Sequence, residues 1–415
     1  MQLKSHLEWL APELLLPILK HLPDLECLDN LLGASPAAFR LFNIHGGEIF
    51  EAILTECSNT NIIHKFTCAL IRIDALVRSS SLPPEINCLI SFQNLVRHES
   101  TPHRFNPPKW TLGPTKISSQ VPTNVLREVL ATHRKITCLT ISCLSFYLRR
   151  FTPLRPSHLV DKTYRFINGA TGASRSEYYP AWKENPALEP FPVVDIGHPT
   201  WVEEQRVFRA FWRVQLVHDM RASRAVPDGQ FLKLDGMSVV DFYDIPLQTL
   251  IESPREPCFY QQVILLEHEL IWSVVDYMAE DRRTIEGPDF LRTRRDWQIP
   301  TSQEPRDSKT MDDYSSLTCD LMYHISGWGH PMAGDASPIQ HVPFVLFRRL
   351  GFAIWDEERL SKYGFYGCQR GSLFAAWRSV LGPDEIAEVE RVNQEEDEAF
   401  FKGVTPDSDG SDYET

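Results

Sequence analysis

Residues 10–42 read LAPELLLPILKHLPDLECLDNLLGASPAAFRLF, and this stretch decides the fold of the N-terminus. Its leucines recur at three- and four-residue spacings, which predicts helices that each carry one apolar face. Pro12 suits the first turn of a helix, Pro23 ends that helix, and Asp24 can cap the next one. Ser35 can cap a third helix. The stretch therefore predicts three short helices that form one compact unit.

Pro17 is expected to disturb the first of these helices. A proline inside a helix removes a hydrogen bond and costs about 3 kcal/mol. We therefore expect a first helix that is bent or starts late.

This unit has more leucine side chains than its interior can hold. A unit of about 40 residues has too little volume to enclose all of them. Some must face outward, and each side chain removed from water contributes about 1.5–3 kcal/mol. These side chains contact either a separate partner or the rest of the same chain.

Helical periodicity continues beyond this unit. It predicts further helices over residues 48–57, 61–79, 85–98, 124–151, 202–222, 261–278 and 383–392. The chain has 30 prolines among 415 residues, which predicts stiff loops between helices, above all over residues 168–199. From Arg391 to Thr415 eight side chains are acidic and two are basic, which predicts a disordered tail.

The predicted fold is therefore all-α and has three parts. Residues 7–45 form the three-helix module, and residues 46–392 form an irregular, proline-rich, multi-helical region. Residues 393–415 form the acidic, disordered tail.

Composition narrows the class of protein. The chain is 43% hydrophobic, which excludes wholesale disorder, and its net charge of −13 does not favour nucleic acid. The nine cysteines form no C-x-x-C pair and are interpreted as buried thiols of a reducing compartment. The longest uncharged run, residues 136–148, has 13 residues, whereas a membrane span needs about 20. We expect an intracellular protein, cytoplasmic or nuclear, with neither nucleic acid nor a membrane as partner.

The N-terminal module resembles an F-box in the pattern Leu10-Ala11-Pro12-Glu13-Leu14-Leu15, followed by Ile18-Leu19, Leu22, Leu25, Leu28, Leu31-Leu32 and Ala34-Ser35-Pro36. The resemblance implies a three-helix unit that binds a Skp-type adaptor, which links it to a cullin scaffold and a ubiquitin-conjugating machinery. The rest of the chain would then select the protein to be ubiquitinated. The adaptor contacts that the resemblance implies are Leu10, Pro12, Leu14, Leu15, Ile18, Leu19, Leu22, Leu25, Leu28, Leu31, Leu32 and Phe39.

Two later segments, residues 203–213 and 350–360, are similar to segments of a large group of F-box-like proteins of filamentous fungi. The module also departs from the family, since Ala11 stands where common F-boxes have proline and Pro17 lies within the first helix. These departures motivate an alternative, a stand-alone helical interaction protein that keeps the F-box fold without a role in a ligase.

No catalytic motif is visible in the sequence. It contains no phosphate loop, no G-x-S-x-G and no H-E-x-x-H. The segment Leu266-Glu267-His268-Glu269-Leu270 has a single histidine and is interpreted as the solvated polar edge of a helix. The residues Cys319, His324, His330 and His341 lie close together in sequence but match no zinc module, so we predict no metal and no cofactor.

Three arginines form a basic stripe within the helix predicted over residues 202–222. Arg206, Arg209 and Arg213 recur at three- and four-residue steps. We expect them on the solvated face of that helix, in local pairs with Glu203 and Glu204. The alternative is a surface that binds an acidic partner or the chain's own tail.

Overall fold

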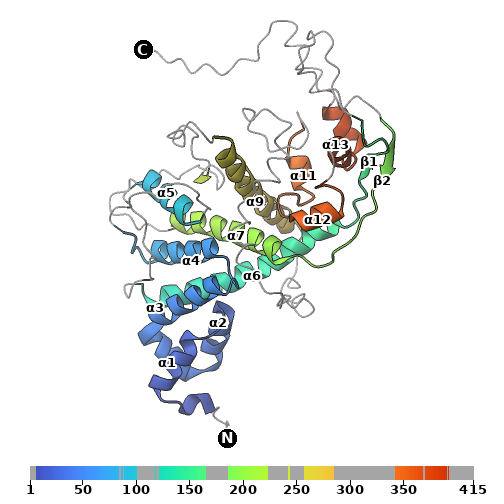
Figure 1. The fold of residues 1–415 in the computed structure, drawn as a ribbon. Helices are drawn as coiled ribbons and strands as arrows, with labels where there is room; N and C mark the ends of the chain where they lie inside the picture. Colours follow the sequence, from blue (N-terminus) through green and yellow to red (C-terminus); the bar gives the residue numbers. More distant parts are fainter. Residues whose placement is uncertain are drawn as a thin grey trace, which may run out of the picture. The chain divides into compact units, whose positions relative to one another are not determined.

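The protein is described by a computed structural model that covers residues 6–83, 86, 88–100, 117, 121–164, 186–222, 242–243, 257–284, 342–367, 370–389 and 391. These residues are mainly helical, as predicted, with one two-stranded sheet (Figure 1). The chain divides into two compact units. Unit 1 comprises Met1–Leu148, Pro199–Pro257 and Leu266–Ser316, and unit 2 comprises Arg149–His198, Cys258–Leu265 and Leu317–Thr415.

The N-terminus of unit 1 forms the expected short helices. They are η1 (His6–Trp9), α1 (Pro12–Lys20), α2 (Leu25–Ala34) and α3 (Pro36–Asn59). Both predicted caps are present: the Asp24 carboxylate accepts a hydrogen bond from the Cys27 N–H at 2.7 Å, and the Ser35 hydroxyl accepts one from the Ala38 N–H at 3.1 Å. The expectation of a late start at Pro17 was wrong, because α1 begins at Pro12 and contains Pro17.

Helix α3 is longer than predicted. It consists of two helical segments that meet at a kink at His45, which has non-helical backbone angles (φ −116°, ψ 20°) and directly precedes Gly46. Gly46 serves a close approach instead, because a Cβ at this position would lie 2.7 Å from Cγ2 of Thr123. Glycine therefore brings α3 against the start of α6 without ending the helix.

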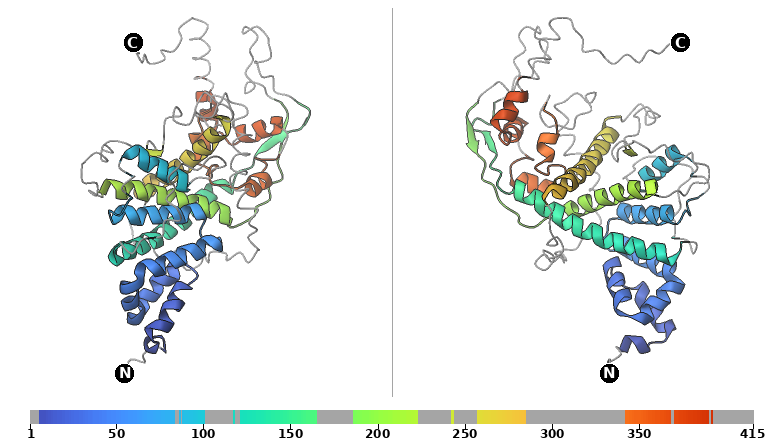
Figure 2. Two further views of the ribbon diagram at one scale, coloured as in Figure 1. Left: turned by 60° about the vertical axis from the view of Figure 1, so that its left-hand side comes forward. Right: turned by 180° about the vertical axis from the view of Figure 1, so that it is seen from behind.

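Helix α4 is central to the next part of unit 1 and contacts α3, α5 and α7. Helix α4 lies between α3 and α7 in every view (Figures 1 and 2). The helices that build this part are α4 (Lys65–Arg78), α5 (Leu89–Ser100), α6 (Thr123–Phe151), α7 (Trp201–Ala222) and α9 (Pro257–Thr284). Their shared core contains Leu70, Ile71, Phe211 and Trp212, each at most 2% exposed. The uncharged run of residues 136–148 lies within α6.

Unit 2 is built on aromatic side chains. Its described elements are β1 (Ser157–Leu159), β2 (Leu188–Pro190), α11 (Val345–Arg348), α12 (Glu357–Lys362) and α13 (Arg370–Arg378), followed by a helical stretch at 383–389. Strands β1 and β2 pair antiparallel, with Ser157 opposite Pro190. Phe151 contacts Trp355 and Tyr363 at centroid distances of 5.3 and 4.6 Å, and all three are buried. Strand β2 lies within residues 168–199, where the sequence predicted a loop, and β1 lies before that range.

Among the described helices, none combines the length and the apolar character needed to cross a membrane.

Candidate docking surface

Helix α1 has two different faces. Leu15 and Leu19 are 2% and 0% exposed and pack into the module. Leu14 and Ile18, one position before each of them, are 59% and 42% exposed. Residues four apart lie above one another on a helix. Leu14 and Ile18 therefore form an apolar row on the outside of α1.

Trp9, just before α1, adds to the exposed apolar area. Its side chain is 74% exposed, and its element η1 is fixed by the preceding residue, Glu8. The Glu8 carboxylate accepts hydrogen bonds from the Ser35 hydroxyl and, at 3.2 Å, from the Ala37 N–H. Ser35 and Ala37 lie at the N-terminus of α3, where the helix dipole also favours a carboxylate. We call Trp9, Leu14 and Ile18 the α1 surface.

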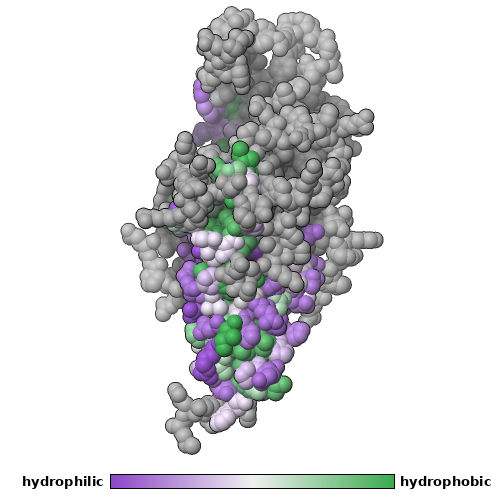
Figure 3. All heavy atoms as spheres, turned by 90° about the vertical axis from the view of Figure 1, so that its left-hand side faces the viewer, coloured by the Kyte–Doolittle hydropathy of each residue, from purple (hydrophilic) through white to green (hydrophobic). Residues whose placement is uncertain are grey.

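The α1 surface belongs to a region where hydrophobic residues gather. Figure 3 shows hydrophobic residues among hydrophilic ones at the N-terminal end of the molecule. Ile44 of α3 is another exposed apolar residue of the module, 75% exposed.

The structure divides the residues that the resemblance assigned to adaptor binding. Pro12, Leu14 and Ile18 are exposed, and Leu10, Leu22, Leu31 and Phe39 are half-buried. Leu15, Leu19, Leu25, Leu28 and Leu32 are buried within the chain. The buried leucines hold the three helices together, so only the exposed and half-buried residues are accessible to a partner.

Sequence reasoning missed Trp9, Glu8 and Ile44. An aromatic residue directly before the leucine-rich stretch was a signal for Trp9. No sequence signal links Glu8 to Ser35, 27 residues later.

The arginine stripe of α7 is not a solvated face. Arg206, Arg209 and Arg213 are only 2%, 1% and 3% exposed, which corrects the prediction. The two oxygens of Glu267 on α9 accept hydrogen bonds from Arg209 Nη2 and Arg213 Nη1. The guanidinium of Arg213 also lies 5.5 Å from the centre of the Tyr243 ring. Buried arginines need such a counter-charge, because desolvating an unpaired cation is very costly.

The interpretation of residues 266–270 as the solvated polar edge of a helix was also wrong, because Glu267 is buried against the arginines of α7. Glu267 is 6% exposed, and Nε2 of His268 lies 3.1 Å from the Tyr243 carbonyl oxygen. This polar pattern therefore marks an interior contact between α7 and α9.

Burial shifts the pKa values of other titratable groups of unit 1 toward their neutral forms, although Asp74 also forms an ion pair with Arg78, with Arg78 Nε 2.8 Å from Asp74 Oδ2. Burial, with a contribution from Arg209, lowers the pKa of His64 to about 2, and burial lowers the pKa of His133 to about 4. Burial raises the pKa of Asp74 well above its usual value. At 2%, 6% and 0% exposed, these three side chains have no access to a substrate. They belong to the core.

Within the described residues, no group of histidine, cysteine, aspartate and glutamate side chains is arranged to hold a metal ion. Cys319, His324, His330 and His341 lie outside the described residues, as does the acidic tail at 393–415.

Comparisons with protein-family models, curated proteins and solved structures give no match for this chain. The α1 surface and its neighbours are therefore interpreted from their geometry and from the F-box resemblance alone.

Proposed function

We propose that this chain is a non-enzymatic substrate receptor of a cullin-type ubiquitin ligase, and that its α1 surface docks a Skp-type adaptor. The observation that carries the proposal is the exposed apolar row of Leu14 and Ile18 on a module whose core leucines, Leu15, Leu19, Leu25, Leu28 and Leu32, are buried. A helix that presents such a row fits an apolar groove on a partner. The region after the module would select the protein to be ubiquitinated.

The energetics agree with a docking role. Burying the exposed parts of Leu14 and Ile18 contributes about 1 kcal/mol each, and the larger exposed area of Trp9 adds to this. Removing these side chains leaves the module intact, because Leu15 and Leu19 hold α1 from its other face.

A second candidate is a stand-alone helical interaction protein that keeps the F-box fold. The inward-facing leucines favour it, since Leu25, Leu28 and Leu32 are all used within the chain.

Co-purification of the full-length chain with a Skp-type adaptor of the same organism tests the proposal. The test variant carries Leu14→Asp and Ile18→Asp. The matched control is Ile90→Asp, an isoleucine on α5 that is 64% exposed and lies outside the module. Circular dichroism checks that every variant is folded.

We expect the wild type and Ile90→Asp to retain the adaptor and the double variant to lose it. Absence of binding by the folded wild type would refute the receptor role and favour the stand-alone protein. Equal binding by the folded double variant would place the adaptor contact elsewhere and contradict the assignment of the α1 surface.

A further inference from the structure

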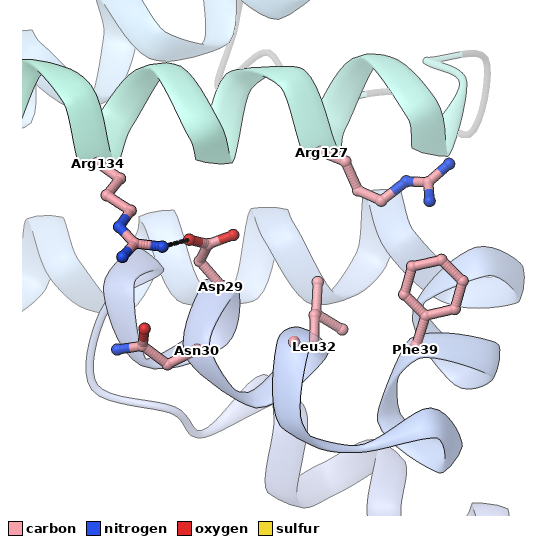
Figure 4. Close-up of a pocket in the computed structure, with 7 residues that line it drawn as sticks. Asp29, Asn30, Leu32, Phe39, Arg127 and Arg134 are labelled. Carbon is pink, nitrogen blue, oxygen red and sulfur yellow. Dashed lines mark ion pairs between the residues drawn. The ribbon is translucent and has the colours of Figure 1, made fainter.

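A separate groove lies on the other side of the N-terminal module, between α2 and α3 and the start of α6. It has a volume of about 330 Å³ and is lined by Asp29, Asn30, Leu32, Gly33, Phe39, Arg127 and Arg134 (Figure 4). All seven residues belong to unit 1. None of the functions proposed above uses the groove as a binding site.

The groove has a cation at each end. Arg127 and Arg134 are seven residues apart on α6, which places them about 10 Å apart along one face of the helix. In Figure 4 the Arg134 side chain descends from α6 toward Asp29, and the Arg127 side chain extends along α6 above the Phe39 ring. Asp29 is the acidic residue of the lining, and its Oδ2 atom lies 3.6 Å from Nη1 of Arg134. Two arginines and one aspartate leave the lining with an excess positive charge.

The excess positive charge of the groove is located at Arg127, because Arg134 is paired with Asp29. The guanidinium carbon of Arg127 lies 5.0 Å from the centre of the Phe39 ring, so the group is held in place by a cation–π contact. Its Nε atom is shielded from solvent and has no hydrogen-bond partner among the described residues. A peptide can therefore reach this guanidinium only through its Nη atoms, and a guanidinium held in place beside an open groove is suited to a carboxylate.

The floor of the groove is apolar and open. Leu32 is 8% exposed at its base, and Phe39 is half-buried. A Cβ built on Gly33 meets no atom within 4 Å, so there is free space beside this residue. The amide of Asn30 at the wall can hydrogen-bond to a peptide backbone.

We propose that this groove binds a short extended peptide of another protein that carries an aspartate or glutamate next to an apolar side chain. The carboxylate pairs with Arg127, and the apolar side chain packs on Leu32 beside Gly33. Charge complementarity selects this occupant over a basic or purely apolar peptide. The proposal rests on the lining of the groove and not on adaptor binding. The groove shares no residue with the α1 surface, although Leu32 and Phe39 of its lining are among the adaptor contacts that the F-box resemblance implies.

The test is a selection of randomised octapeptides displayed on phage against the immobilised full-length chain. Enriched sequences are then synthesised with a fluorescent label, and their affinities are measured by fluorescence anisotropy. Each peptide is paired with a version in which the acidic residue is replaced by its amide.

Three variants of the chain separate the groove from other surfaces. Gly33→Leu fills the free space, and replacing a helical glycine with leucine favours the helix, so the fold is retained. Arg127→Gln removes the charge. Asp29→Asn removes the competing carboxylate and frees Arg134, so it should tighten binding. Gly33→Ala is the matched control for Gly33→Leu.

We expect the enriched peptides to share an acidic residue beside an apolar one. Arg127→Gln should weaken binding about tenfold or more, which is the effect of losing a charge-assisted hydrogen bond. Gly33→Leu should weaken binding because its side chain occupies the space that the peptide's apolar side chain needs. Gly33→Ala should bind like the wild type, and Asp29→Asn should bind more tightly. The proposal fails if no sequence is enriched, if the enriched peptides lack an acidic residue, or if folded Gly33→Leu and Arg127→Gln bind them as the wild type does.

Discussion

The buried pair of arginines that share Glu267 allows a sharp prediction. Replacing Glu267 with glutamine keeps the shape of the side chain and removes the charge that both Arg209 and Arg213 contact. All three side chains are buried. Breaking a buried ion pair from one side costs about 3–5 kcal/mol, because the remaining charge stays desolvated. We therefore expect Glu267→Gln to destabilise unit 1 by about this amount.

Hydrogen exchange read by mass spectrometry measures the effect in α7 itself. A loss of about 3–5 kcal/mol corresponds to exchange that is roughly two to four orders of magnitude faster. The control is Glu13→Gln, which makes the same chemical change at an exposed position of α1 and should leave exchange in α7 unchanged.

A triple variant separates charge from packing. With Arg209→Met, Arg213→Leu and Glu267→Leu together, no unpaired charge remains, and replacing a buried ionic cluster by apolar residues is often neutral or stabilising. Protection of α7 should then return close to the wild-type level. A cost below about 1 kcal/mol for Glu267→Gln alone would refute the reasoning, because it would mean that this carboxylate is not the main counter-charge of the two arginines.

Three further predictions concern single contacts. Gly46→Ala should lower the melting temperature through a clash with Cγ2 of Thr123 that costs about 1–3 kcal/mol, and adding Thr123→Ser, which removes that carbon, should restore it. His133 stays neutral in the fold down to a pKa of about 4 but takes a proton near pH 6.5 when unfolded, so stability falls as the pH drops through this range. Between pH 7 and pH 5 His133→Leu should therefore gain about 2 kcal/mol relative to the wild type in chemical denaturation, and parallel pH profiles would contradict this. Asp24→Ala should cost about 1 kcal/mol by removing the cap on Cys27, whereas Asp24→Ser should cost little; equal losses would argue against the cap.

The long helices were predictable because apolar periodicity over many residues leaves little ambiguity. The prediction of residues 124–151 and 202–222 agrees with α6 (Thr123–Phe151) and α7 (Trp201–Ala222) within one residue. The caps at Asp24 and Ser35 were also predictable, because their side chains act on amides only a few residues away. Strands β1 and β2 were not, since three residues are too few to establish an alternating pattern.

Which face of a helix turns toward the core was harder to predict than the existence of the helix. In α1, positions 14, 15, 18 and 19 are all apolar, so the sequence alone does not decide which pair turns inward; packing on α3 decides it. In α7 the arginines look like a polar face because their counter-charge is distant in sequence. Glu267 lies 54 residues after Arg213, and nothing local connects the two.

The continuity of α3 has a consequence for how the chain can be divided. A cut at residue 45 falls within this helix and separates the N-terminal module from Ile49, Phe50 and Ile53, all completely buried. Both resulting fragments would expose apolar surface and would be prone to aggregate or to be degraded by proteases. The smallest piece that carries the α1 surface and can be handled alone must therefore extend at least to Asn59. A partner held at that surface is joined to the rest of unit 1 through the kink at His45 and the second half of α3, whose side chains Ile49, Phe50 and Ile53 are buried in the core.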